Sequence, residues 1–435
     1  MKAVFLCGGI GKRMFPITRD KSLLRFLGKT LLEHQINMMK DKFEEFVFIC
    51  NNFNKNEIEE ICKKTGIKYE IAIQKKPLGI ADAILSAKEF IDGEILIASP
   101  DDIVEPKAID ILLEESKKSN ENSYILGYKV TSYFPGGYLI VNEKNQLLDI
   151  KEKPGEGNEP SNFVNIVYHI HKDVKTLIKY LETTKSKADD IYELSLKKMS
   201  RDGNKIKVVM YDGFWSAIKF PWDIFKVVRY FLDKSETKIS PSATISEKSS
   251  IEGKVIIEDG VKVLEDATIK GPCYIGKNTI VGTGALVRDY SHMGDNCIIG
   301  YKTEIKNSYI EDNCTFHSNF IGDSIISENC SFGAGSITAN FRFDEKNVKV
   351  KVKNERKDTK LKKFGVIMGK NCKVGVNSSL MPGVKIGPYS IVGPHVILYK
   401  DLAPGKKILV SQTHREKVVE IEDQKLLELK KILGY

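Results

Sequence analysis

The chain has 435 residues, of which 42% are apolar, and its net charge is +9. This length predicts two or three domains, and the apolar content is typical of a globular protein. No apolar run approaches the ~20 residues that cross a bilayer, so we expect no membrane partner. The eight cysteines form no C-x-x-C pair, which favours buried thiols in a reducing cytoplasm over disulfides or zinc ligands.

Residues 1–232 alternate short apolar runs with helix-like stretches. We expect strands at four of these runs, residues 3–6, 46–50, 69–74 and 94–98. The alternation predicts a Rossmann-like α/β domain whose mixed sheet is largely parallel. An amphipathic helix over 222–232 closes this domain, and the polar stretch 233–240 is the expected linker.

A glycine-rich loop, Cys7-Gly8-Gly9-Ile10-Gly11-Lys12-Arg13, follows the first expected strand. Glycines let backbone N–H groups approach phosphate oxygens, and the two cations complement the phosphate charge. The loop is not a Walker loop, because the glycine expected six residues before Lys12 is Leu6. It is not a dinucleotide fingerprint, since Met14 replaces the third glycine. Taken alone, the loop is equally consistent with a tight strand-to-helix turn.

Further motifs follow this loop in a characteristic order. Residues 6–18 read L-x-G-G-x-G-x-R-M-x-P-x-T and are followed by Lys21. The later motifs are Q-x-x-x-L-G at 74–79, Asp101 after a buried strand, E-K-P at 152–154 and S-N-x-x-N at 161–165. Together they resemble the signature of the sugar-phosphate nucleotidyltransferases, over about residues 1–230.

The resemblance implies that a sugar 1-phosphate attacks the α-phosphorus of a nucleoside triphosphate and expels pyrophosphate. Such a transfer needs cations and Mg²⁺ rather than a protein nucleophile. By resemblance, Arg13 and Lys21 hold the triphosphate, Asp101 binds Mg²⁺ and Lys153 meets the sugar phosphate. The other residues that the resemblance assigns to the nucleotide or the sugar are Leu6, Gly8, Gly9, Gly11, Gln74, Gly79, Gly137, Glu152 and Asn165.

Several positions depart from the nucleotidyltransferase pattern. The family segment W-x-D-[IV]-G-x-P-W-D lies at 215–223, where Ala217 replaces the second metal-binding aspartate and Lys219 replaces the glycine. Two further glycines and a threonine are also replaced, by Pro100, Val167 and Ile80. A side chain in place of glycine alters how closely a substrate can approach. The first domain is therefore either a slow nucleotidyltransferase or a module that only binds a sugar nucleotide.

From residue 245 onward, a large aliphatic side chain returns at every sixth position. The positions are Ile245, Ile251, Ile257, Val263, Ile269, Ile275, Val281, Val287, Met293, Ile299 and Ile305, and then Met368, Val374, Leu380, Ile386, Val392 and Leu398. Polar residues or glycine stand two positions later, which disfavours a β-sandwich. A smaller residue stands four positions later. This pattern predicts a triangular parallel β-helix over 241–410, with its register lost between 305 and 368.

The segment between residues 305 and 368, where the six-residue pattern is interrupted, carries two more motifs. Residues 317–324 read H-S-N-F-I-G-D-S, and residues 333–340 read G-A-G-S-I-T-A-N. They resemble segments of the bifunctional enzymes that make UDP-N-acetylglucosamine, most closely the archaeal branch, with Phe320 where that family has tyrosine. The resemblance implies a left-handed β-helix, a homotrimer, and acetyl-CoA and UTP as co-substrates.

Acetyl transfer to glucosamine 1-phosphate requires a group that removes a proton from the amine, and imidazole titrates near neutral pH. By resemblance, His317 is this base and Asn340 positions the reacting groups. Lys346 and Lys349 would bind phosphates of the sugar or the cofactor, and Ser378 would contact acetyl-CoA. Two alternatives stay open. One is a different sugar-phosphate nucleotidyltransferase whose β-helix serves assembly; the other is an acetyltransferase with a non-catalytic first domain.

Eleven lysines and arginines lie between Lys346 and Lys373, against Glu355 and Asp358. This excess predicts either a solvated loop or a site for a polyanion. A phosphorylated metabolite or a nucleotide-bearing cofactor fits better than nucleic acid, because few aromatic residues interleave with the lysines.

The last segment, 411–435, is expected to form a helix. Apolar residues recur on one helical face, at Val418, Ile421, Leu426, Leu429 and Leu433. Such a face predicts packing against the coils or against a neighbouring subunit.

Overall fold

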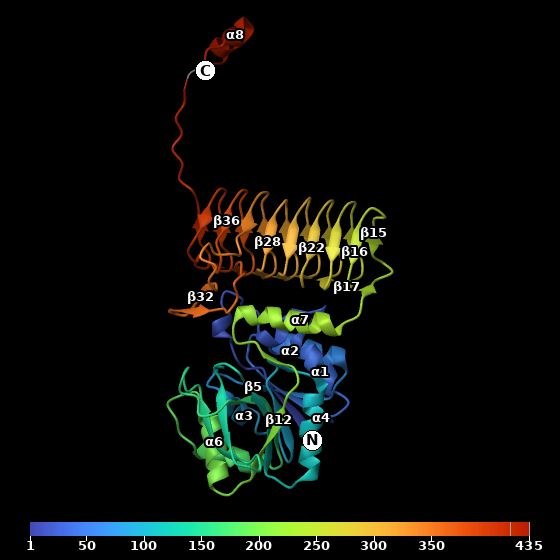
Figure 1. Ribbon diagram of the computed structural model, residues 1–435, viewed down its shortest axis with the longest axis vertical. Coiled ribbons are helices and arrows are strands. Elements are labelled where there is room, and N and C mark those ends of the chain that lie inside the picture. Colours follow the sequence, from blue (N-terminus) through green and yellow to red (C-terminus); the bar gives the residue numbers. More distant parts are fainter. Residues whose placement is uncertain (418, 435) are drawn as a thin grey trace.

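The computed structural model describes residues 1–417 and 419–434, and it forms two stacked bodies (Figure 1). An α/β domain comes first and a β-helix follows it. Helix α7 (Ile224–Lys234) lies between the two bodies, two residues further along the chain than the sequence predicts. The first β-helix strand, β14, begins at Lys238, so residues 235–237 join the two bodies, a shorter linker than the predicted 233–240.

Nine strands form the sheet of the first domain. They are β1 (Lys2–Leu6), β4 (Glu45–Cys50), β5 (Tyr69–Ile73), β6 (Ile95–Ala98), β8 (Ser123–Lys129), β9 (Gly137–Val141), β10 (Leu147–Glu152), β11 (Phe163–His171) and β12 (Ile206–Tyr211). β1 runs parallel to β4 and β6, and β4 runs parallel to β5, as the alternating pattern predicts. β11 is antiparallel to β6, β8 and β9, so the sheet is mixed.

Helices cover both faces of this sheet. They are α1 (Leu31–Met39), α2 (Lys55–Thr65), α3 (Ile80–Ser86), α4 (Pro106–Lys118), α5 (Val174–Thr183) and α6 (Ile191–Arg201). Successive residues of a strand point to opposite faces. Val4 and Phe5 therefore enter different apolar clusters, one formed with α3, α5 and α6 and the other with α1, α2 and α4.

The β-helix consists of three parallel sheets, one on each side of a triangular coil. The first sheet holds β14 (Lys238–Ile239), β17 (Val255–Ile257), β20 (Cys273–Ile275), β23 (His292–Met293), β26 (Tyr309–Ile310), β29 (Ile325–Ile326), β34 (Ile367–Met368) and β37 (Lys385–Ile386). The second holds β15 (Thr244–Ile245), β18 (Lys262–Val263), β21 (Ile280–Val281), β24 (Ile298–Ile299), β27 (Thr315–Phe316), β30 (Ser331–Phe332), β35 (Lys373–Val374), β38 (Ile391–Val392) and β40 (Lys407–Ile408). The third holds β16 (Ser250–Glu252), β19 (Thr268–Lys270), β22 (Leu286–Arg288), β25 (Glu304–Lys306), β28 (Phe320–Gly322), β31 (Ile337–Thr338), β36 (Ser379–Leu380) and β39 (Ile397–Leu398).

The six-residue register is lost after Ile305, as the sequence indicates, but the coils themselves continue to Thr338. A regular coil takes 18 residues, since Ile275 pairs with Met293. Met293 then pairs with Ile310, and Ile305 pairs with Ile321, so these coils are one or two residues shorter. Shorter turns move the inward residues along the sequence but leave them stacked in space.

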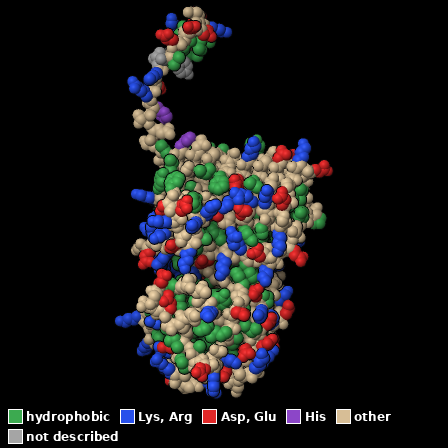
Figure 2. All heavy atoms as spheres, in the orientation of Figure 1, with side chains coloured by type: hydrophobic (Ala, Val, Ile, Leu, Met, Phe, Trp, Pro, Cys, Tyr) green, Lys and Arg blue, Asp and Glu red, His purple; other side chains and the backbone are tan. Residues whose placement is uncertain are grey.

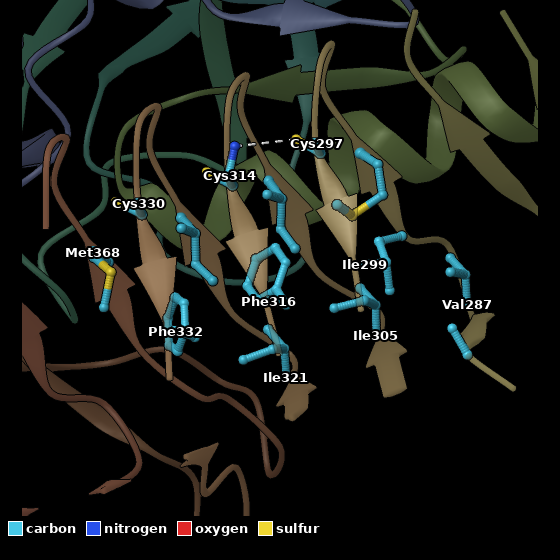
Figure 3. Close-up of a cluster of buried hydrophobic side chains, with 14 of the residues drawn as sticks. Val287, Cys297, Ile299, Ile305, Cys314, Phe316, Ile321, Cys330, Phe332 and Met368 are labelled. Atoms are coloured by element: carbon cyan, nitrogen blue, oxygen red, sulfur yellow. Dashed lines mark hydrogen bonds between the residues drawn. The ribbon is translucent and has the colours of Figure 1, made fainter. Parts of the chain in front are cut away.

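Large inward side chains stack along the axis of the β-helix (Figure 3). The rings of Phe316 and Phe332, in adjacent coils, have centroids 5.2 Å apart. Smaller residues occupy the corners, where Cys297, Cys314 and Cys330 form a row. Each of the eight cysteines is free and buried, as the sequence predicts.

The interruption itself is an insertion between β31 and β34. The residues that leave the coil lie within 340–365 and include an antiparallel hairpin of β32 (Lys349–Val352) and β33 (Glu355–Asp358). β29 pairs directly with β34 across this insertion. The hairpin is therefore an addition to one coil and does not end the β-helix.

The outer face of the first sheet packs against the α/β domain. Tyr274, His292 and Tyr309 stack in consecutive coils, with ring centroids 4.7 and 5.0 Å apart. Phe26 of the α/β domain packs against Tyr309 in the same apolar cluster. Ion pairs of 2.9 Å also cross this interface, between Arg19 and Glu328 and between Arg25 and Asp312. This interface fixes the position of the two bodies relative to each other.

The C-terminal helix is shorter than predicted, and it stands apart from the coils. α8 spans Gln424–Leu433, whereas 411–417 and 419–423 are not helical. None of its residues is buried, and it lies away from the β-helix in Figure 1, so packing against coils of the same chain was a wrong prediction. Val418 lies outside the described residues. Among the described residues, no helix is long and apolar enough to cross a membrane.

Candidate active sites

A cavity of about 610 Å³ opens at the carboxyl edge of the parallel strands of the α/β domain. It brings together the residues that the sequence assigns to nucleotidyl transfer: Leu6, Gly8, Gly9, Gly11, Arg13, Lys21, Gln74, Gly79, Asp101, Gly137, Glu152, Lys153 and Asn165. Ligands bind at this edge of open α/β sheets because the loops that follow the strands meet there. The motifs, far apart in the chain, therefore form one site.

The glycine loop is shaped by its neighbour Gln74. A Cβ on Gly8 would overlap Oε1 of Gln74, so only glycine lets that side chain pass. Nε2 of Gln74 donates to the carbonyl of Gly79 at 3.0 Å and to Asp82 Oδ2 at 2.9 Å, which fixes the side chain at the cavity wall. Gly11 has φ 58°, a left-handed conformation that favours glycine.

Two lysines surround the carboxylate of Asp101. Lys21 forms an ion pair with Oδ2, Lys219 Nζ lies 4.0 Å from the same oxygen, and Ser99 Oγ donates to Oδ1 at 2.5 Å. Burial opposes ionisation of Asp101, but the charges of Lys21 and Lys219 outweigh it and hold the pKa of this carboxyl below its usual value. Asp101 is therefore ionised, as a metal ligand must be.

The position of the second metal-binding carboxylate is apolar. β13 (Trp215–Ala217) pairs with β7 (Asp102–Val104), which sets Ala217 opposite Asp102. Asp102 is not a substitute ligand, because it is buried and accepts hydrogen bonds from Trp215 Nε1 at 3.1 Å and from the Val167 N–H at 3.4 Å. Burial raises its pKa.

The residues present fit a Mg²⁺ ion that the protein would hold through one carboxylate, that of Asp101. Among the described residues, no group of three or more His, Cys, Asp or Glu side chains could hold a metal ion. Mg²⁺ commonly takes one or two carboxylates and completes its octahedron with phosphate oxygens and water. The nucleotide would therefore supply most of the ligands.

Asn165, which lines the cavity, ends a buried hydrogen-bonded chain. His169 Nε2 lies 2.6 Å from Oδ1 of Asn165, and its Nδ1 lies 2.5 Å from the hydroxyl of Tyr192. Burial holds the pKa of His169 well below its usual value, so the ring is neutral and its Nε2–H donates to Asn165. This contact orients the Asn165 amide group. Nearby, burial and then the charge of Glu152 raise the pKa of Glu193 to about 8.

The β-helix presents its predicted residues on an open surface. His317 lies in the turn between β27 and β28, and its side chain is exposed. Asn340 follows β31, at the other edge of the third sheet and one coil further on, where its Nδ2 donates to Asp323 Oδ2 at 2.5 Å. Phe320 lies between these two edges on the outer face of the sheet. One chain therefore does not bring His317 and Asn340 into contact.

Ser378 does not offer its hydroxyl to a cofactor. The side chain is fully buried, and Oγ donates to the carbonyl of Gly393 at 2.8 Å. The position is a corner of the coil, and the proximity of Ser378 to acetyl-CoA stays a prediction. Lys346 and Lys349 are exposed, but Lys349 belongs to the hairpin, which packs against the α/β domain.

Comparison with known proteins agrees with this two-part arrangement. Residues 2–229 match the family model for nucleotidyl transferases, and residues 254–289 and 365–400 match that for bacterial transferase hexapeptide repeats. The chain is 34% identical over 407 residues to the bifunctional protein GlmU of Methanocaldococcus jannaschii, covering 92% of this chain and 96% of that protein. A bifunctional sugar-1-phosphate nucleotidylyltransferase/acetyltransferase of Sulfurisphaera tokodaii is 33% identical over 412 residues, covering 93% and 99% of the two chains.

The chain belongs to this bifunctional nucleotidyltransferase–acetyltransferase family. Its β-helix is accordingly the left-handed helix of hexapeptide repeats, as the sequence predicts. The cavity of the α/β domain also contains residues that the nucleotidyltransferase motifs did not indicate: Ser99, Asp102, Asp189, Glu193 and Lys353. The adjacent acidic pair after β6 could have drawn attention to Asp102. No sequence signal could have placed Lys353, since it comes from the β-helix.

Proposed function

We propose that the protein makes UDP-N-acetylglucosamine in two steps. The β-helix acetylates glucosamine 1-phosphate with acetyl-CoA, and the α/β domain then transfers UMP from UTP to N-acetylglucosamine 1-phosphate. The observation that carries this proposal is the meeting of every nucleotidyltransferase motif in one cavity, on a chain whose β-helix holds His317 and Asn340. Both known relatives described above are bifunctional by name.

In nucleotidyl transfer, the chain neutralises and orients charge. The triphosphate lies over the glycine loop, with Arg13 and Lys21 at its phosphates. Lys153 meets the sugar phosphate, whose oxygen attacks the α-phosphorus while pyrophosphate leaves. When bound, Mg²⁺ supplies further neutralisation of the phosphate charge. Preorganised cations of this kind stabilise the transition state without a covalent intermediate.

In acetyl transfer, the amine of glucosamine 1-phosphate attacks the thioester carbon of acetyl-CoA. A C–N bond forms, the C–S bond breaks, and the electron pair leaves with the CoA sulfur. His317 takes the proton from the amine and can return it to the thiolate. Asn340 positions the reacting groups, and Lys346 and Lys349 bind phosphate groups.

We also propose a homotrimer whose acetyl-transfer sites lie between subunits. The open third sheet supports this assembly, since Ile337 and Ile397 are exposed on the face that carries Phe320. Figure 2 shows further apolar side chains at the end of the β-helix from which the C-terminal segment leaves. The eight free, buried thiols support a cytoplasmic location.

A substrate panel tests the proposal. Release of pyrophosphate and of free CoA is measured separately, with four common nucleoside triphosphates and with glucosamine and N-acetylglucosamine 1-phosphates. We expect CoA release with glucosamine 1-phosphate and pyrophosphate release with UTP and N-acetylglucosamine 1-phosphate. Pyrophosphate release with another base or sugar, and no CoA release, would instead favour a nucleotidyltransferase whose β-helix serves only assembly.

One observation favours a second candidate function. Ala217 removes a carboxylate from the metal region, and Lys219 brings a fixed positive charge to Asp101. The α/β domain could then bind a sugar nucleotide without catalysis while the β-helix transfers acetyl groups. Release of CoA with no pyrophosphate from any nucleotide would establish this candidate and overturn the first.

A further inference from the structure

The hairpin of β32 and β33 starts in the β-helix but lies against the α/β domain (Figure 1). Its residues alternate, so that Lys349 and Lys351 are exposed while Val350 and Val352 are buried. The two valines belong to the apolar cluster that includes Trp222 of the α/β domain. One face of the hairpin is therefore part of the interface between the two bodies.

The base of this hairpin is firmly held. Thr359 Oγ1 donates to the carbonyl of Val348 at 2.7 Å, and the Val348 N–H donates to the carbonyl of Leu361 at 2.9 Å. Phe364, which is fully buried, packs edge-on against Trp222 with ring centroids 6.4 Å apart. These contacts fix the hairpin relative to the α/β domain, and they therefore define the position of its tip.

The tip of the hairpin reaches the nucleotidyl-transfer cavity. Lys353, in the turn between the two strands, has φ 54° and an exposed side chain that lines the cavity. Of the described residues that line it, Lys353 alone comes from the β-helix. Lys21 and Lys153 have carboxylate partners in the cavity, whereas no carboxylate of the described chain lies within 4.0 Å of the Lys353 ammonium. Lys353 is thus a cation in the cavity lining without a carboxylate in ion-pair contact, and Glu355 of the same hairpin interacts with its charge only at longer range.

The packing of the hairpin indicates which part of a ligand Lys353 would meet. The apolar cluster that holds Val350 also includes Met14, which follows Arg13, and Ile218, which precedes Lys219. The hairpin therefore approaches from the side of the glycine loop. Arg13 and Lys219 line the same cavity as Lys353. Phosphate groups are the ligand chemistry that such cations attract.

We propose that Lys353 binds the phosphate groups of the nucleoside triphosphate and of the pyrophosphate product. The β-helix thereby supplies a binding residue to the nucleotidyl-transfer site of the same chain. This inference rests on the proposed function of the α/β domain. It also gives a role to one lysine of the basic segment 346–373, because the charge of Lys353 would act in the cavity of the α/β domain.

Lys353→Met in the full-length protein tests the proposal, because it removes the charge and keeps most of the length of the side chain. Calorimetry measures the dissociation constants of inorganic pyrophosphate and of a non-hydrolysable UTP analogue. We expect both to weaken by about two- to fivefold, since one exposed charge contact contributes up to about 1 kcal/mol. The KM for UTP should rise similarly, whereas the KM for the sugar phosphate and the rate of acetyl transfer should not change.

Two matched variants complete the test. Lys357→Met changes the same charge on the same hairpin, at an exposed position that does not line the cavity, and should bind both ligands like the parent. Lys353→Arg should restore binding. Unchanged affinity in Lys353→Met, or equal weakening in Lys357→Met, would overturn the proposal. A parent that binds UTP analogues but releases no pyrophosphate would refute nucleotidyl transfer while leaving the role of Lys353 in binding measurable.

Discussion

The two candidate sites differ in how much of each one chain supplies. The nucleotidyl-transfer cavity is enclosed by loops at a sheet edge, and its charged groups already face one another, as Lys21 and Asp101 do. The acetyl-transfer residues lie on a flat sheet of the β-helix, where His317 is exposed and Asn340 belongs to the neighbouring coil. A concave edge forms a site by itself, whereas a flat face needs a second surface to exclude water.

The largest expected effect follows from removing the proposed base. His317→Ala should lower the rate of acetyl transfer by roughly 10²–10⁴-fold, because the amine then loses its proton acceptor. Nucleotidyl transfer should stay unchanged, since His317 is not part of that cavity. Separate assays of CoA and pyrophosphate release provide the measurement. His395→Ala, at an exposed histidine of the same β-helix, is the control and should leave both rates intact. Equal loss of both activities in His317→Ala would mean a folding defect.

The next effect concerns assembly. The parent should scatter light as a particle about three times the 49.0 kDa mass of the chain. Ile337→Glu places a charge on the exposed face between His317 and Asn340 and should separate the subunits. We expect acetyl transfer to fall about 100-fold, because misplaced reacting groups cost this much, while nucleotidyl transfer continues. A monomeric parent that transfers acetyl groups would contradict the idea of a site between subunits.

A smaller effect is expected in the metal region of the α/β domain. Ala217→Asp with Lys219→Gly restores a second carboxylate and removes the lysine that faces Asp101. The Mg²⁺ concentration for half-maximal pyrophosphate release should fall roughly fivefold, equivalent to about 1 kcal/mol of binding. Calorimetric titration of Mg²⁺ in the presence of a non-hydrolysable nucleotide gives a readout independent of activity.

The single variant Ala217→Asp separates the effect of the added carboxylate from the effect of removing Lys219. In this variant the new carboxylate can pair with Lys219, and Mg²⁺ binding should then improve little. If neither variant changes Mg²⁺ binding, then the missing carboxylate does not limit the parent.

The sequence predicted the architecture well because the fold depends on repeated local patterns. The aliphatic residue at every sixth position specifies the inward side chains of each coil. The short apolar runs between helix-like stretches specify the strands β1, β4, β5 and β6. The six-residue pattern carries no information where the spacing changes without a change in structure. Coils of 16 or 17 residues moved the aliphatic positions out of the six-residue pattern, although the sheets continue through them.

The candidate sites of the two domains were predictable to the extent that their residues stand in recognised motifs. Two features were not. The buried hydroxyl of Ser378 depends on which side of a coil corner it faces, and the sequence context alone did not indicate this. The position of Lys353 in the nucleotidyl-transfer cavity depends on how the hairpin of β32 and β33 packs on the α/β domain. This packing is a long-range contact that leaves no local pattern in the sequence.

The smallest expected effect lies at the interface that joins the two bodies. Burial holds the pKa of His292 at about 4, although the charge of Asp312 opposes this shift. Its Nε2 accepts a hydrogen bond from the Leu27 N–H at 3.2 Å, so the ring is neutral in the folded protein. The unfolded chain, with a histidine pKa near 6.5, takes up a proton first as the pH falls. The free energy of unfolding that His292 contributes is therefore complete above about pH 7 and is lost progressively down to about pH 4.

His292→Phe keeps the aromatic stack with Tyr274 and Tyr309 but removes this titration. At pH 7.5 the variant should be less stable than the parent by about 1–3 kcal/mol, because the Leu27 N–H loses its acceptor. At pH 5 the gap should narrow by about 1–2 kcal/mol, since only the parent then gains a proton on unfolding. Thermal unfolding of both proteins at the two pH values measures this change, and His395→Phe serves as an exposed control. A gap that is the same at pH 5 and pH 7.5 would mean that His292 does not sense pH, and that the interface relies on packing and on the Arg19 and Arg25 ion pairs instead.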